Sequence, residues 1–76
     1  MEAYKVGVTY PIEEVRTYVE EHESFYADLS RPNQASIRNH HAMDDVQAEF
    51  YLEGDKATCI FNIYDETSYG LVNSEQ

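Results

Sequence analysis

The first regular pattern in the chain is an alternation of apolar and other residues over positions 4–10. One face would carry Tyr4, Val6, Val8 and Tyr10, and the other Lys5, Gly7 and Thr9. A period of two is typical of a half-buried strand, so we expect a strand over residues 4–10. Pro11 ends this pattern and suits the first turn of a helix, where its missing N–H costs nothing.

Between residues 11 and 29 the period of the apolar positions becomes helical. The i, i+3, i+4 spacing aligns one stripe: Ile12, Val15, Tyr18, Val19, His22, Phe25, Tyr26 and Leu29. This pattern predicts an amphipathic helix over residues 11–29. Residues 30–33 break it, because the position before Pro32 disfavours helical geometry. A weaker pattern over residues 33–42 predicts a short second helix or a structured loop.

Residues 45–65 predict a β-hairpin, with strands over 46–53 and 56–64 and a turn at Gly54-Asp55. Glycine in the first position of a two-residue loop suits a type II′ turn. A register that pairs Leu52 with Ala57 places apolar residues together on one face. That face pairs Phe50–Cys59, Ala48–Phe61 and Val46–Ile63; the other pairs Glu53–Lys56, Tyr51–Thr58, Glu49–Ile60 and Gln47–Asn62. Residues 69–72 would add a short final strand or cover an edge.

The order of these elements predicts a small two-layer α+β domain, in which one helix packs on a small, mainly antiparallel sheet. A length of 76 residues allows a single domain, 1–76. Hydrophobic residues make up 42% of the chain, including seven tyrosines and three phenylalanines. This content is too high for a disordered acidic tail, so we expect a folded protein.

The cysteine count and the apolar runs indicate a cytoplasmic protein. Cys59 is the single cysteine, which excludes an intramolecular disulfide and a cysteine-based zinc cluster. A free thiol suits a reducing cytosol. No apolar run approaches the roughly 20 residues of a membrane span, and the N-terminus lacks the apolar region of a secretory signal. We expect a cytoplasmic location, in the host cell if the chain is phage-encoded.

Two groups of residues are candidates for chemistry. His40-His41 followed by Asp44-Asp45 offers possible metal ligands, since residues 41 and 45 would share a helix face. The spacing matches no established zinc signature, and we favour surface histidines with an aspartate that caps the entry into the hairpin. His22 is expected at the edge of the core with a hydrogen-bond partner. Cys59 is expected to be a small buried residue that faces Phe50.

No combination of residues suggests an enzyme. The sequence offers no nucleophile with a neighbouring base and no glycine-rich loop for a phosphate. Paired carboxylates are plentiful, but an open helix face lacks the enclosing pocket that would shift the pKa of one of them. We therefore expect neither catalysis nor a cofactor nor a bound metal.

Charge is the feature that points to a function. The chain has fifteen acidic residues against five Lys and Arg, a net charge of −10 and a pI near 4.4. Such a chain repels nucleic acids and anionic membranes, so we expect direct binding to neither. On the predicted helix, acids gather opposite the apolar stripe, with Arg16 as the obvious base nearby. The expected partner-binding residues are Glu13, Glu14, Glu20, Glu21 and Asp28 on the helix, and Glu49, Tyr51, Glu53 and Asp55 on the hairpin.

An array of this kind can imitate the phosphates of nucleic acid in the basic groove of a protein. We expect a small inhibitor, monomeric or homodimeric, that blocks a basic DNA- or RNA-handling protein. A phage or mobile-element anti-defence protein (anti-CRISPR or anti-restriction) would act in this way on a CRISPR effector, a restriction enzyme or a DNA-repair enzyme. Three alternatives stay open: an acidic domain charged only for solubility, a protein adapted to high salt, and an antitoxin-like or regulatory subunit.

Overall fold

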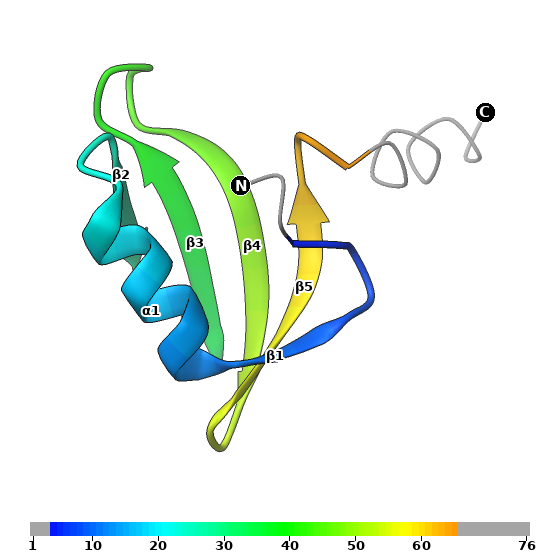
Figure 1. Cartoon of the computed structure of the whole chain (residues 1–76). Helices are drawn as coiled ribbons and strands as arrows, with labels where there is room; N and C mark the ends of the chain where they lie inside the picture. Colours follow the sequence, from blue (N-terminus) through cyan, green and yellow to red (C-terminus); the bar gives the residue numbers. More distant parts are fainter. Residues whose placement is uncertain (1–3, 66–76) are drawn as a thin grey trace, which may run out of the picture.

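The computed structural model describes residues 4–65, which form one α-helix and a five-stranded antiparallel sheet. Along the chain the elements are β1 (Thr9–Pro11), α1 (Ile12–Glu21), β2 (Phe25–Asp28), β3 (Gln34–Asn39), β4 (Asp45–Glu53) and β5 (Lys56–Asn62). The strand order is β1-β5-β4-β3-β2, so β2 to β5 form a meander and β1 pairs with β5 (Figure 1). The small α+β architecture agrees with the prediction, but the sheet has five strands where three were expected.

The hairpin near the end of the chain matches the prediction around its turn. Leu52 pairs with Ala57, and the predicted pairs Glu53–Lys56, Tyr51–Thr58 and Phe50–Cys59 are also present. Gly54 has a φ of +61°, whereas Asp55 is not among the residues with positive φ. This combination is the one that a type II′ turn requires. The expected strand over residues 69–72 lies outside the described residues.

Farther from the turn the hairpin register differs from the prediction, because the ladder contains a β-bulge between Glu49 and Phe50. Glu49 pairs with Phe61, which places the Phe61 side chain on the face away from the helix. Asn62 instead reaches the core face, opposite Ala48, and β5 ends there rather than at residue 64. The predicted pairs that this bulge displaces are Ala48–Phe61, Val46–Ile63, Glu49–Ile60 and Gln47–Asn62.

The strand expected over residues 4–10 is shortened to β1, Thr9–Pro11. The backbone turns before it, with a Gly7 φ of +90° and a hydrogen bond from Val8 N to Lys5 O of 3.2 Å. Gly7 N still donates to Cys59 O at 2.7 Å, so this segment runs beside β5 without regular pairing. The turn lets the Tyr4 side chain, 2% exposed, enter the core.

The helix expected over residues 11–29 ends at Glu21, and the prediction beyond that point is wrong. His22 takes an extended conformation, and its ring Nδ1 lies 2.7 Å from Tyr18 O, where it closes the last turn. Phe25–Asp28 then forms β2. Residues 25, 27 and 29 also alternate at a period of two, which the helical spacing of Phe25 and Leu29 concealed.

The second helix expected over residues 33–42 is instead β3, Gln34–Asn39. Ala35 and Ile37 are buried on the helix side of the sheet, and Ser36 points to the other face, where its hydroxyl donates to Glu49 at 3.2 Å. Asn33 has a φ of +58° and reverses the chain after Pro32. The period of two in this segment is thus the pattern that decided its structure.

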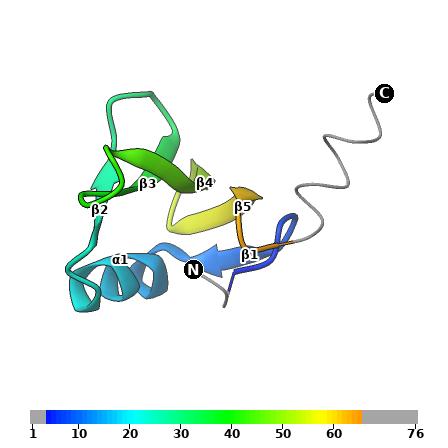
Figure 2. The same cartoon turned by 90° about the horizontal axis from the view of Figure 1, so that it is seen from above.

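The core lies between α1 and one face of the sheet, on the single side that the helix covers (Figure 2). Tyr4 is at its centre, with its ring edge-on to three other rings: Tyr10 at 4.8 Å, Phe50 at 5.4 Å and Tyr18 at 5.5 Å between centroids. The other buried members are Val15, Ile37, Ala48, Ala57 and Cys59. Within residues 4–65, no helix is long and apolar enough to cross a bilayer.

Candidate functional site

The sheet divides the predicted partner-binding residues into two groups. Four of them, on the side of the sheet that the helix covers, belong to α1: Glu13, Glu14, Glu20 and Glu21. Glu49, Tyr51 and Glu53 alternate along β4 with residues that face the helix, so they project from the outer face. Asp55 sits in the hairpin turn, where its carbonyl oxygen accepts a hydrogen bond of 2.9 Å from Ile12 N at the start of α1. The helix and sheet acids therefore occupy different sides of the molecule.

Asp28, expected on the helix, lies at the end of β2 and belongs to the outer-face group because it pairs with Ser36. Its carboxylate accepts a hydrogen bond from Ser30 N at 3.0 Å and forms an ion pair with Arg38 Nε at 3.0 Å. These two donors, Ser30 first, lower the pKa of the Asp28 carboxyl. Asp28 is thus compensated within the protein and offers less charge to a partner than the sequence suggested.

The helix acids are mostly uncompensated. Arg16 forms an exposed ion pair with Glu13 at 3.2 Å, three residues earlier. Within the described chain, no ion pair involves Glu14, Glu20 or Glu21, all of which are exposed. Glu14 and Glu21 have no lysine or arginine three or four residues away, so α1 lacks there the stabilisation that Glu–Lys pairs would give.

An open depression lies along one flank of α1. Its lining consists of carboxylates, hydroxyls and aromatic rings, from Tyr4, Glu13, Glu14, Thr17, Tyr18 and Glu21. The Tyr18 ring is held in place by stacking on His22, with centroids 3.9 Å apart. Exposed carboxylates in an open depression suit a lysine or arginine side chain, since the charges attract the cation. We refer to these six residues as the acidic depression.

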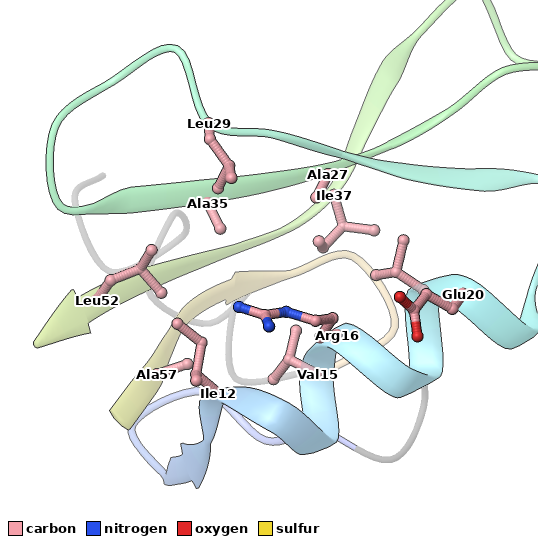
Figure 3. Close-up of a pocket in the computed structure, with 11 residues that line it drawn as sticks. Ile12, Val15, Arg16, Glu20, Ala27, Leu29, Ala35, Ile37, Leu52 and Ala57 are labelled. Carbon is pink, nitrogen blue, oxygen red and sulfur yellow. The ribbon is translucent and has the colours of Figure 1, made fainter. Parts of the chain in front are cut away.

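A second concavity lies on the opposite flank of α1, between the helix and the sheet (Figure 3). Its volume is about 230 Å³, and the ionisable side chains in its lining are Arg16 and Glu20, from consecutive turns of α1. The apolar lining comes from Ile12, Val15, Val19, Ala27, Leu29, Ala35, Ile37, Leu52 and Ala57. We refer to it as the apolar groove. It is smaller than most small-molecule sites, which hold about 300–1,000 Å³.

Sequence reasoning did not predict the apolar groove, because two of its walls are strands in segments whose apolar spacing predicts helix. The signal was present as two short alternations, Ala27 with Leu29 and Ala35 with Ile37. Both are too short to outweigh the longer helical periodicity that surrounds them.

The residues considered for chemistry have structural roles. His40 stacks on Tyr26, with centroids 4.4 Å apart, and Tyr26 OH donates to Asp44 Oδ1 at 2.8 Å. His22 has the expected hydrogen-bond partner but is exposed. Among residues 4–65, no group of three or more His, Cys, Asp or Glu side chains could hold a metal ion.

Cys59 is fully buried and faces Phe50, as predicted. Burial raises the pKa of its thiol to about 11, so it is protonated near neutral pH and a poor nucleophile. No protein-family model, curated protein or solved structure matches this chain. Its function must therefore be inferred from the two concavities and the charge around them.

Proposed function

We propose that this protein is a non-catalytic inhibitor that binds a basic, nucleic-acid-handling protein through the acidic side of α1. The observation that supports this proposal is the set of exposed carboxylates without ion pairs, Glu14 and Glu21 in particular, that line the acidic depression. A cationic side chain from a partner would supply the charge that α1 lacks.

The physical basis is electrostatic complementarity. A net charge of −10 on 76 residues creates a field that steers a basic partner toward the protein. Partner lysines and arginines that normally contact phosphates would contact the carboxylates instead, and bound counterions would be released. Tyr18, fixed by its stacking on His22, adds a rigid aromatic surface with little ordering cost.

The partner class we favour is an enzyme that binds nucleic acid, such as a CRISPR effector, a restriction enzyme or a DNA-repair enzyme. Occupation of its phosphate groove would block the substrate without chemistry, as suits a phage-encoded anti-defence protein in the host cytoplasm. The small size and the acidic surface support this context. An antitoxin-like subunit that neutralises a basic toxin uses the same surface and is the second candidate.

Affinity capture with purified candidates tests the proposal. The affinity for a basic nuclease should fall by about tenfold or more between low and moderate salt, and duplex DNA should compete for the complex. Capture of neutral or acidic proteins alone, or a complex insensitive to salt and DNA, would contradict it. Cooperative unfolding in dilute buffer would separately exclude adaptation to high salt.

A further inference from the structure

The outer edge of β2 offers unused backbone hydrogen-bonding groups. β2 is the last strand of the sheet, and no other described strand pairs with its outer side. The hydrogen bond of 2.8 Å from His40 N to Ser24 O shows which residues of β2 direct their backbone groups toward β3. In an antiparallel pair these bonds involve alternate residues, so Tyr26 and Asp28 direct their backbone groups to β3. Ala27 therefore directs its N–H and C=O outward.

The outward backbone groups of Phe25 and Ala27 differ in whether the described chain gives them a hydrogen-bond partner. Phe25 N donates to His22 O at 2.9 Å, within the turn that follows α1. Within residues 4–65, no hydrogen bond is made to the outward N–H or C=O of Ala27, which is an exposed residue. An exposed edge of this kind is a template for another strand.

The apolar groove opens beneath this same edge. The side chains of Ala27 and Leu29 line it from the sheet side, and that of Glu20 lines it from α1 (Figure 3). Val19 of α1 belongs to the same lining. Leu29 is 64% exposed, so this apolar wall is not covered by the described chain. Because side chains alternate along a strand, a strand added to β2 would direct every second side chain into the groove. Its volume suits apolar side chains of a peptide.

The charge around the β2 edge indicates which kind of segment could bind there. A second copy of the chain would bring a further −10 of charge to this edge, which opposes self-association. Glu20 lies at the mouth of the groove without an ion pair, whereas Arg16 is already paired with Glu13. We infer that the β2 edge and the apolar groove together bind an extended segment of the partner, in which apolar residues alternate with lysine or arginine, by β-strand addition. This inference rests on the proposed function for the basic character of the partner.

A synthetic peptide in which lysine and valine alternate provides the probe. In NMR titration we expect shifts of the Ala27 amide and of the Val19 and Leu29 methyl groups, with slower hydrogen exchange at Ala27. A matched peptide that alternates glutamate and valine should bind at least about tenfold more weakly, because it meets Glu20 and the acidic field. Equal affinity for the two peptides would overturn the inference.

The variant Ala27→Pro removes the outward N–H, and the β2–β3 hydrogen bonds do not use that group. We expect it to bind the lysine–valine peptide about tenfold more weakly, as for one lost backbone hydrogen bond. Ala27→Ser keeps the N–H, so we expect it to bind the peptide more tightly than Ala27→Pro does. Methylation of the peptide's own backbone nitrogens tests the same contact without altering the protein, and unchanged affinity there would refute strand addition.

Two further outcomes would contradict the inference. Peptide-induced shifts confined to Glu14, Tyr18 and Glu21 would place binding in the acidic depression and leave the β2 edge idle. Shifts of Ala27 and Leu29 that depend on protein concentration alone would show that a second copy occupies the edge. If Ala27→Pro leaves the capture of a basic nuclease unchanged, the inference is wrong while the proposed function stands. Absence of any basic partner would remove the proposed function itself.

Discussion

The fully buried side chain of Asn62 donates from Nδ2 to the backbone carbonyl of Tyr4 at 2.7 Å. Asn62 Oδ1 also accepts a hydrogen bond of 2.9 Å from Tyr64 N. One polar side chain thus ties the segment before β1 to the chain after β5. Buried polar groups are stable only when they are hydrogen-bonded, and here the bonds fix Tyr4 at the centre of the core.

Substitution Asn62→Ala should lower the free energy of unfolding by about 2–3 kcal/mol. The change leaves the Tyr4 carbonyl without its partner and opens a small cavity beside Ala48. Urea denaturation followed by circular dichroism measures the effect. Glu23→Ala, at an exposed position after α1, is the matched control and should change stability by less than about 0.5 kcal/mol. Equal effects of the two substitutions would show that the buried bonds contribute nothing.

The stability of the protein should depend on which residue occupies position 54 of the hairpin turn. Gly54 has a φ of +61°, and a Cβ built there would meet no atom within 4 Å. The cost of Gly54→Ala is therefore backbone strain alone, about 1 kcal/mol. Gly54→Asn should cost less, because asparagine is, after glycine, among the residues that primed hairpin turns favour. If denaturation shows that both variants are as stable as the natural protein, the turn does not hold this conformation.

The thiol of Cys59 should be protected from alkylation in the folded protein. Burial raises its pKa from 9.0 to about 11, which lowers the thiolate fraction about a hundredfold near neutral pH. Steric burial slows the reaction further. Iodoacetamide labelling followed by mass spectrometry should therefore be rapid only in urea. Comparable rates in the presence and absence of urea would contradict the buried placement of Cys59.

Stability should fall on the alkaline side of pH 9.0. Burial raises the folded-state pKa of Cys59 from 9.0 to about 11 and that of Tyr4, mainly by burial and then by Glu14, from 10.0 to about 12. The native state binds these protons more tightly, so their contribution is full below the unfolded pKa values and is lost as the pH rises through the folded values. Thermal melting across this range measures the loss.

The variant Tyr4→Phe serves as the control for this pH dependence. It keeps the ring but removes the hydroxyl that donates to Glu14 O at 3.3 Å. The decline of its melting temperature should be shallower above pH 10.0, where Tyr4 begins to titrate in the unfolded chain. A melting temperature that rises with pH in the natural protein would contradict the burial of both groups.

The fold was predictable where one local pattern dominated. Gly54 fixed the turn, and alternation along β4 and β5 fixed the register as far as Phe50 and Cys59. Beyond them a bulge shifts the pairing and brings Asn62 to the core face, where it contacts Tyr4, which is far away in the sequence. Local periodicity holds no information about such a distant partner.

The helix boundary and β3 were mispredicted for a related reason. Phe25 and Leu29 satisfy the spacing of a helix and of a strand equally well, and His22 ends α1 through a side-chain contact with Tyr18 O that no propensity encodes. The acidic character of the helix survives in the structure, but Asp28 moves to the outer face and the apolar groove appears. Both differences follow from β2 and β3, which pair with each other and, through β4, with the rest of the sheet.

The central claim is that the acidic side of α1 binds a basic partner, and paired charge reversals test it most directly. Glu14→Lys with Glu21→Lys alters the acidic depression. Asp45→Lys with Glu53→Lys makes the same change in net charge at exposed positions of β4. Circular dichroism should confirm that both variants are folded.

The decisive measurement is the affinity of both double variants for the captured basic protein, by isothermal titration calorimetry at one salt concentration. We predict that Glu14→Lys with Glu21→Lys abolishes binding, and that Asp45→Lys with Glu53→Lys weakens it only modestly through the altered net charge. Equal losses in the two variants would show that bulk charge, not the acidic depression, drives association. Unaltered affinity after the helix reversal would show that this side of α1 binds nothing.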